Sequence, residues 1–379
     1  MINPLAGKDA ENVGTNFKFL VEVWDGDKKI DHKWFGNEKG SEYVFAFESA
    51  KEKEDAPQLP PTVRVAGDGS KNVFIYNQAL GSGKMEEEAL AVIDYWHPHT
   101  YEFVADNKTT LRLKQRCSEK LEEKIITKAH GRGVKVLPMV SAFTKPLVQR
   151  ILDNPSTAAD RIADAIKEEG YDGVAVDLET ISLGSESSDE YVEFMRRLRQ
   201  ELPASQYEIA IAVSPRFEGS EKAGYRHHGF YDYQGLAKYA DFIHIMAYDF
   251  HKGRRGASPV LPNDKIDDII EYAQARVAND QIVFLMPLYG YVWTSGGSAV
   301  GTISAQNNQR YIDAAKSKGY SNGELRIETA DRIAYLQDSK VFEDRLQLLE
   351  ILNVNNVGGW RQTHGTKGIY NEFGEWKQQ

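Results

Sequence analysis

The sequence of 379 residues contains a single cysteine, Cys117, so no disulfide can form within the chain. Its folded structure must therefore depend on a hydrophobic core rather than on covalent crosslinks. The sequence also lacks an apolar run long enough to span a membrane. Its first residues, MINPLAGKDAENVG, show no basic region followed by an apolar one. We therefore expect no membrane insertion and see no secretory signal peptide.

Basic residues are fewer than acidic residues. The chain has 46 Lys and Arg and 56 Asp and Glu, which gives a net charge of −10. No cluster of Lys and Arg interrupts this acidic balance. Nucleic acid and anionic membrane surfaces are therefore poor candidate partners. Apolar residues make up 41% and charged residues 27% of the chain, which is typical of a globular protein. The length suits one large domain with a small one, or two of medium size.

Residues 1–85 have the pattern of a small all-β domain. Apolar residues alternate with others from Phe17 to Val23, and the Asp25-Gly26 pair that follows is typical of a hairpin turn. The domain would be sandwich-like, and it would dock to a protein or glycan or serve as a structural cap. Further short β-rich runs begin at Tyr43, Thr62 and Asn72.

The composition changes at residues 81–88, and from there strand-like and helix-like segments alternate to the C-terminus. Such repeats predict a parallel sheet, and about 290 residues suit a (β/α)8 TIM barrel over residues 88–379. An insertion at about 294–335 would precede the last strand. An open doubly wound sheet is the alternative, although no GxGxxG motif follows the first strand. The predicted strands lie in residues 89–96, 134–142, 171–179, 207–215, 239–251, 281–293 and 356–362.

Amphipathic helices separate several of these strands, as in residues 118–133 and 264–278. In the helix within residues 154–170, Thr157 and Asp160 have the spacing of a capping box, and Gly170 is a typical stop. This helix leads directly into the strand that carries the most informative residues.

Two carboxylates end that strand, YDGVAVDLE. Asp177 and Glu179 are two positions apart, so on a strand they point to the same face. Burying two charges costs free energy unless they have partners. Active sites of barrels lie at the C-terminal ends of the strands, so this pair is our first candidate for catalysis. A structural ion-pair network at the strand end is the alternative.

The segments YDGVAVDLE, IMAYDFH, MPLYGYVW and GGWRQ follow one another in this order along the chain. In order and spacing, these four segments resemble glycoside hydrolase family 18, the chitinase family. The family signature DxxDxDxE reads here as Asp172, Ala175, Asp177 and Glu179. The segments IMAYDFH, MPLYGYVW and GGWRQ are similar to the sixth, seventh and last strands of the family. Together they cover residues 88–379 and look most like the bacterial branch of spore-cortex-lytic N-acetylglucosaminidases. The LysM repeats that often accompany that branch are not visible.

The resemblance implies a retaining β-N-acetylglucosaminidase that acts on a GlcNAc-containing glycan, peptidoglycan or chitin-like, without metal or cofactor. Its mechanism would be substrate-assisted. Glu179 would be the general acid and base, with a raised pKa because Asp177 lies beside it. Asp177 would hold the N–H of the substrate's 2-acetamido group, and Tyr248 would donate to the acetamido oxygen. Such a substrate suggests an extracellular or cell-envelope protein.

Other residues would contact the sugar or shape its pocket. Trp360 would form an apolar floor under the reacting sugar. Asp172 has the opposite parity to Glu179 on a strand, so a structural role is the alternative to substrate contact. The remaining substrate-binding candidates are Met246, Asp249, Tyr289, Tyr95 and Trp293, and a position in the core or at the rim is the alternative for each.

Two pairs of histidines could suggest metal ligands. His97 and His99 flank a proline, and His227 and His228 are adjacent. No third ligand is identifiable for either pair, so we interpret them as loop or sugar-contact residues and predict no metal site.

Ala175 stands where the family pattern has a third inward carboxylate, which can share a proton with the acid at the position of Asp177. We predict that activity survives with an altered pH dependence. A glycan-binding protein on an inactive barrel is the alternative function, although the retained Glu179 favours an enzyme. An endoglycosidase for protein-linked glycans is a third reading.

Overall fold

The computed structural model describes residues 18–25, 28–36, 70–78, 80, 86–105, 111–180, 183–218 and 229–379. The chain divides into two units, Met1–Pro61 and Thr62–Gln379.

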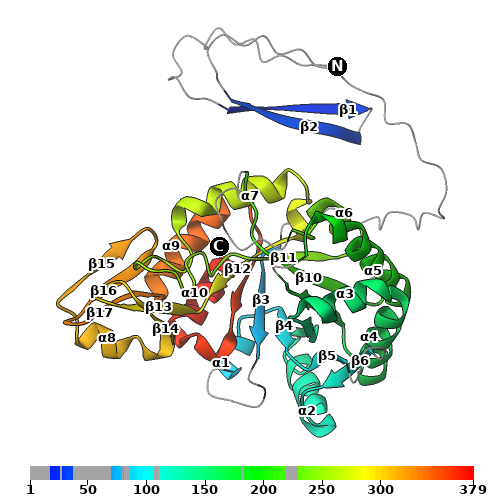
Figure 1. The fold of residues 1–379 in the computed structure, drawn as a ribbon, viewed down its shortest axis with the longest axis horizontal. Helices are drawn as coiled ribbons and strands as arrows, with labels where there is room; N and C mark the ends of the chain where they lie inside the picture. The colour runs from blue at the N-terminus through cyan, green and yellow to red at the C-terminus, as the bar shows by residue number, and fades with distance from the viewer. Residues whose placement is uncertain are drawn as a thin grey trace. The chain divides into compact units, whose positions relative to one another are not determined.

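In the first unit, β1 (Lys18–Asp25) and β2 (Lys28–Gly36) pair in antiparallel fashion (Figure 1). The strands of the predicted hairpin are thereby confirmed. Its turn and the β-rich runs from Tyr43 and Thr62 lie outside the described residues. A complete N-terminal all-β domain therefore stays a prediction.

The run from Asn72 belongs to the main sheet and not to the N-terminal domain. It forms β3 (Asn72–Asn77), which pairs in parallel with β18 (Asn356–Trp360) on one side and β4 (Tyr95–Pro98) on the other. Our assignment of this run was wrong. Residues 73–76 are buried, as expected of a strand covered on both faces, and an apolar run does not reveal which sheet it joins.

The segment 89–96, predicted as the first barrel strand, combines two elements. Helix α1 (Glu86–Leu90) occupies its start, and β4 begins only at Tyr95. Ala89, Leu90 and Ile93 are buried, so the segment is apolar because it packs against the core and not because it is one strand.

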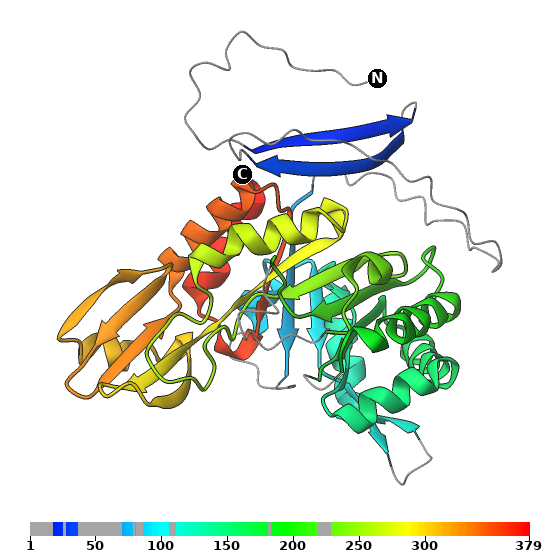
Figure 2. The same cartoon turned by 45° about the horizontal axis from the view of Figure 1, so that its top comes forward.

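The parallel strands follow one another around the main sheet in chain order, from β3 and β4 through β7 or β8, β9, β10, β11 and β12 to β18. Since β18 pairs back with β3, and β7 and β8 join β4 to β9, the sheet is curled and TIM-barrel-like (Figure 2). The bounds are β7 (Lys135–Val136), β8 (Met139–Ala142), β9 (Gly173–Leu178), β10 (Glu208–Val213), β11 (Phe242–Met246) and β12 (Ile282–Pro287). A hairpin of β5 (Tyr101–Ala105) and β6 (Leu111–Gln115) adds to the edge of β8.

Helices lie outside these strands (Figures 1 and 2). In α4 (Pro155–Glu169), Ala158, Ile162 and Ile166 form the buried stripe, and Gly170 ends the helix with φ 75°. The predicted capping box is wrong, because the helix begins at Pro155 and Thr157 is already inside its first turn. The other helices are α2 (Glu119–His130), α3 (Lys145–Asp153), α5 (Ser188–Glu201), α6 (Tyr233–Ala237), α7 (Ile266–Gln274), α9 (Ser339–Ile351) and α10 (Lys367–Gln378). No helix in the described ranges has the length and apolarity to traverse a bilayer.

A second sheet of five antiparallel strands lies between β12 and β18 in the chain, at the position predicted for the insertion. It starts at Tyr289 rather than 294, because YGYVW forms its first strand and not the end of β12. A buried ion pair joins it to α9, with Arg345 and Glu324 3.1 Å apart. The elements are β13 (Tyr289–Thr294), β14 (Ala299–Ser304), α8 (Gln309–Asp313), β15 (Ser317–Ser321), β16 (Glu324–Glu328) and β17 (Arg332–Leu336).

Candidate active site

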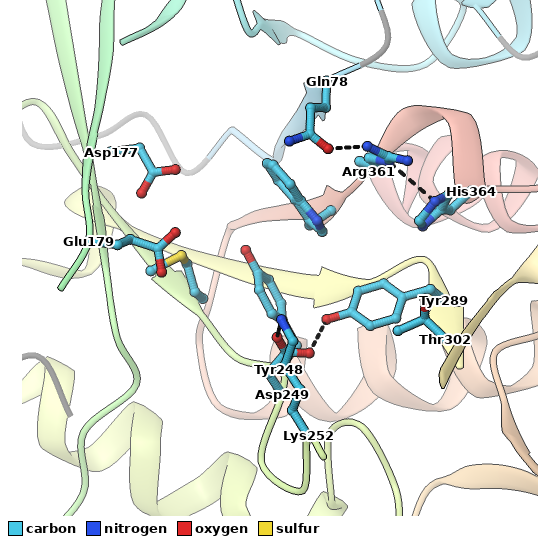
Figure 3. Close-up of a pocket in the computed structure, with 12 residues that line it drawn as sticks. Gln78, Asp177, Glu179, Tyr248, Asp249, Lys252, Tyr289, Thr302, Arg361 and His364 are labelled. Carbon is cyan, nitrogen blue, oxygen red and sulfur yellow. Dashed lines mark hydrogen bonds and ion pairs between the residues drawn. The ribbon is translucent and has the colours of Figure 1, made fainter. Parts of the chain in front are cut away.

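A pocket opens at the C-terminal ends of the main-sheet strands and contains Asp177 of β9 and Glu179, which directly follows this strand (Figure 3). Ser141 of β8 pairs with Asp177, and the amide of Glu179 donates to the carbonyl of Ala142 at 2.8 Å. The backbone is thus fixed up to the second acid. The lining residues are Gln78, Asp177, Glu179, Met246, Tyr248, Asp249, Lys252, Tyr289, Thr302, Trp360, Arg361 and His364.

The two acids differ in their surroundings. Asp177 is 4% exposed, and its Oδ1 has no hydrogen-bond partner among the described residues. Burial, followed by the charge of Glu179, raises the pKa of Asp177 well above its usual range. Burial also raises the pKa of Glu179 to about 7, while Lys252 opposes this rise and Asp249 adds to it. Glu179 therefore holds a proton for part of the time at neutral pH.

Asp249 organises the side of the pocket that follows β11. The hydroxyls of Tyr289 and Tyr291 both donate to its Oδ1, and Lys252 Nζ donates to its Oδ2 at 2.6 Å. Its φ of 65° lies in the left-handed region, which Asp tolerates better than most residues. Because both carboxylate oxygens are occupied, Asp249 is suited to fixing its neighbours in place.

Aromatic residues form the remaining wall. Tyr248 and Trp360 pack against the buried residues inside the barrel, and Met246 belongs to the same group. Burial raises the pKa of Tyr248 well above its usual range, and Glu179 and Asp177 add to this. Its phenol therefore stays protonated and can donate a hydrogen bond. Trp360 also lies near Tyr76, with ring centroids 5.8 Å apart.

Asp172 and Tyr95 do not reach the pocket, so we correct their prediction as substrate-binding residues. Asp172 precedes β9, at the opposite end from the pocket, where its Oδ2 accepts from Val136 N at 2.7 Å and from His130 Nε2 at 2.8 Å. The structural alternative therefore fits it. Tyr95 begins β4, and its hydroxyl donates to Glu208 Oε1 at 3.3 Å. Its ring stacks on Phe74 at 4.3 Å.

Trp293 is likewise absent from the pocket. It lies buried in β13 between the rings of Tyr291 and Tyr335, and its Nε1 donates to the Arg254 carbonyl at 3.2 Å. Its assignment to sugar stacking is corrected, because the indole is 1% exposed and packs in a buried cluster with Val260, Tyr289, Tyr291 and Tyr335.

His97 and His99 are buried, and neither lines the pocket. His97 lies in β4, so its interpretation as a loop residue is wrong, whereas His99 does lie in the loop between β4 and β5. His97 Nδ1 donates to the Leu137 carbonyl at 2.9 Å, and His99 Nε2 lies 2.7 Å from Ser141 Oγ. Burial lowers the pKa of each to about 4. His227 and His228 lie outside the described residues. Within the part that is described, no three His, Cys, Asp or Glu side chains gather as a metal site would require.

Five lining residues were missed by the sequence interpretation. Arg361 and His364 directly follow the last strand, and residues at that position of a barrel face its mouth. Lys252 similarly follows β11, so its position carried a signal that could have been used. Gln78 follows β3 and was hidden by the wrong assignment of that strand. Thr302 comes from the insertion and had no signal.

Comparison with known proteins gives one family. Residues 61–360 match the model of glycosyl hydrolases family 18. The Bacillus subtilis protein YdhD, named as a sporulation-specific glycosylase, is 28% identical over 237 residues, which cover 59% of this chain and 55% of that protein. The cortical fragment-lytic enzyme of Bacillus subtilis is 26% identical over 234 residues, covering 56% of this chain and 52% of that protein. The chain thus spans about half the length of these relatives.

Solved structures agree in fold. A chitinase from Chromobacterium violaceum ATCC 12472 superposes with a TM-score of 0.70 at 16% identity, over 82% of this chain and 100% of that one. At this identity the likeness shows a shared fold.

Proposed function

This chain belongs to the glycosyl hydrolases family 18, and on that premise we propose that it is a retaining β-N-acetylglucosaminidase acting on a GlcNAc-containing glycan. The observation that carries the proposal is that Asp177, Glu179, Tyr248 and Trp360 line the same pocket. The name of the cortical fragment-lytic relative supports peptidoglycan, and that of the structural neighbour supports chitin, as the kind of polymer cleaved.

Glu179 acts as the general acid and then as the general base. A carboxyl with a pKa of about 7 holds a proton near neutral pH and still releases it readily. It protonates the glycosidic oxygen as the bond from that oxygen to the anomeric carbon breaks. The substrate's acetamido oxygen forms the new bond to this carbon and gives an oxazolinium ion. Water then attacks the same carbon, the bond from the acetamido oxygen to this carbon breaks and restores the acetamido group, and Glu179 takes the proton that the water releases.

Asp177 and Tyr248 hold the acetamido group during this step. The unpaired, buried Oδ1 of Asp177 is an acceptor suited to the acetamido N–H. Burial holds the pKa of Asp177 high, and the positive charge that develops on the acetamido group favours the carboxylate form, which balances that charge. Tyr248 remains protonated and donates to the acetamido oxygen. Trp360 provides the apolar floor. These groups are preorganised in a pocket from which much of the solvent is excluded, where such interactions are strong.

The test is Glu179→Gln, which keeps the shape of the side chain and removes its proton transfer. We expect kcat to fall by about 10²–10⁴-fold with KM close to the parent value. Glu123→Gln, on the exposed face of α2, is the matched control. Parental turnover by Glu179→Gln would end the proposal.

Product analysis after incubation with peptidoglycan, chitin oligomers and a glycoprotein identifies the bond that is cleaved. Release of intact glycans from the glycoprotein alone would favour the endoglycosidase alternative. Binding of an oligomer by the parent protein without turnover would favour a glycan-binding protein on an inactive barrel. This alternative is tested because Ala175 stands where the family pattern has a carboxylate.

A further inference from the structure

Arg361 places a partly buried positive charge in the pocket beside Trp360. One of its terminal N–H groups donates to Gln78 Oε1, and its Nε–H donates to His364 Nε2 at 3.2 Å. A guanidinium has only donors, so the His364 nitrogen must accept. Burial and Arg361 together lower the pKa of His364 to about 4, so this ring is uncharged at neutral pH. Both partners of Arg361 are therefore neutral.

Other buried or pocket-lining cations have carboxylate partners. Arg345 is paired with Glu324, Arg199 with Asp241, and Lys252 with Asp249. No carboxylate of the described residues forms an ion pair with Arg361. A partly desolvated charge without a counter-charge costs free energy, and a ligand that supplies the counter-charge recovers it.

The position of this cation separates it from the reacting bond. Figure 3 shows Arg361 with Gln78 and His364 across the pocket from Asp177 and Glu179. The charges that act on the pKa of Glu179 are those of Lys252 and Asp249. A group bound by Arg361 would therefore lie on a part of the substrate next to the sugar that is cleaved.

We propose that Arg361, with Gln78 and His364, forms a subsite for a carboxylate carried by the glycan, so that the substrate is an acidic and not a neutral GlcNAc polymer. This inference rests on the proposed function and adds a specificity-determining residue to it. The planar fork of arginine matches the two oxygens of a carboxylate. Chitin has no carboxylate. Peptidoglycan can supply one from the lactyl group of its muramic acid or from the peptide attached to that group.

The experiment compares soluble peptidoglycan fragments with the same fragments after their carboxylates have been converted to amides. We expect kcat/KM of the parent to be about tenfold higher on the acidic form. Arg361 is partly exposed, so the free energy of its hydrogen bond to a charged group should lie at the low end of the usual range. Fragments stripped of peptide, which keep only the lactyl carboxylate, show which source is bound. A neutral chitin oligomer of equal length serves as a reference.

Arg361→Gln should lose the preference for the acidic form, so that its kcat/KM values on the acidic and the amidated fragments agree within about twofold. Arg361→Lys keeps the charge without the fork and should retain part of the preference. Arg276→Gln removes a guanidinium that stacks on Tyr272 in the α7 region and is the matched control. Equal kcat/KM of the parent on both forms, or a preference that persists in Arg361→Gln, would overturn the inference.

A binding measurement separates this inference from the proposed function. Calorimetric titration of Glu179→Gln with the acidic and amidated fragments reports the preference without turnover. If Glu179→Gln binds the acidic form about tenfold more tightly but the parent cleaves neither form, the carboxylate subsite is supported and the proposed hydrolase activity is contradicted. If the parent cleaves both forms equally, the hydrolase activity is supported and the carboxylate subsite is contradicted.

Discussion

Lys252 Nζ lies 2.6 Å from Asp249 Oδ2, and these two residues act in opposite directions on the pKa of Glu179. Burial raises that pKa to about 7, Lys252 lowers it and Asp249 raises it. The hydroxyls of Tyr289 and Tyr291 hold Asp249 from the other side. The proton affinity of the candidate acid can therefore be changed in either direction at one ion pair, without altering Glu179 itself.

Lys252→Met should move the alkaline limb of the kcat/KM profile to higher pH. Activity requires protonated Glu179 and is lost as pH rises through its pKa, so removal of a charge that lowers this pKa extends activity upward. The lysine side chain is 59% exposed and therefore screened by solvent, so we expect a shift of about half a pH unit. Profiles measured between about pH 5 and 9 test this, with Lys318→Met as control. A downward shift would contradict the assignment of Glu179.

Asp249→Asn should move the same limb to lower pH, because it removes a negative charge that raises the pKa of Glu179. Asparagine tolerates the positive φ at this position, so the turn after Tyr248 is expected to persist. The double variant with Lys252→Met should return towards the parent profile, since the two opposing charges are then both absent. Shifts of the same sign in both single variants would refute this account.

Glu179→Gln should be more stable than the parent in alkaline solution. The folded state raises the pKa from 4.5 to about 7, so the folded protein binds this proton more tightly than the unfolded chain. The contribution of this proton to the stability of the parent is consequently fully present below about pH 4.5, is lost as pH rises towards 7, and is absent above it. At about pH 8 the variant should gain roughly 2–3 kcal/mol in free energy of unfolding.

Urea unfolding of parent and variant at about pH 4.5 and 8 measures this gain. The difference should be near zero at the lower pH, and Glu123→Gln should show none at either. A gain that is equal at both pH values would mean that the ionisation of Glu179 is not its cause.

Asp172→Ala should weaken the fold and leave the chemistry intact. It removes the acceptor of the Val136 amide, and an unsatisfied amide at this site costs about 1–3 kcal/mol. The variant should unfold at lower urea concentration, with the pH profile and KM of the parent. A drop in kcat without loss of stability would instead restore Asp172 to the substrate-binding residues.

Local patterns predicted the acidic strand, and the resemblance to glycoside hydrolase family 18 predicted much of the rest of the pocket. The two-residue period of a strand is enough to place Asp177 and Glu179 on one face. The ends of parallel strands then bring Tyr248 and Trp360 to the same mouth. Gly170 was identifiable as a helix stop because it adopts a left-handed conformation that other residues avoid.

The wrong predictions have a common physical origin. An apolar sequence indicates that a segment is buried, but it does not indicate which other segment covers it. The run from Asn72 could join either sheet, and its pairing with β18 depends on residues 284 positions away. Trp293 is as apolar as a sugar platform but is buried in a cluster with Tyr289, Tyr291 and Tyr335. His97 was interpreted as a loop or sugar-contact residue because no third metal ligand was identifiable, whereas its ring is buried inside the barrel and donates to the Leu137 carbonyl.

The imidazoles of His97 and His244 lie 5.0 Å apart inside the barrel, and burial lowers the pKa of both. The unfolded chain takes up protons at these rings below about pH 6.5, whereas the folded chain resists them, so acidification favours unfolding. Alkali removes the proton that Glu179 needs, and acid adds protons that the scaffold cannot accommodate. The pH range in which the protein is active is therefore limited at high pH by the loss of the catalytic proton, and at low pH by the unfolding that protonation of the buried histidines favours.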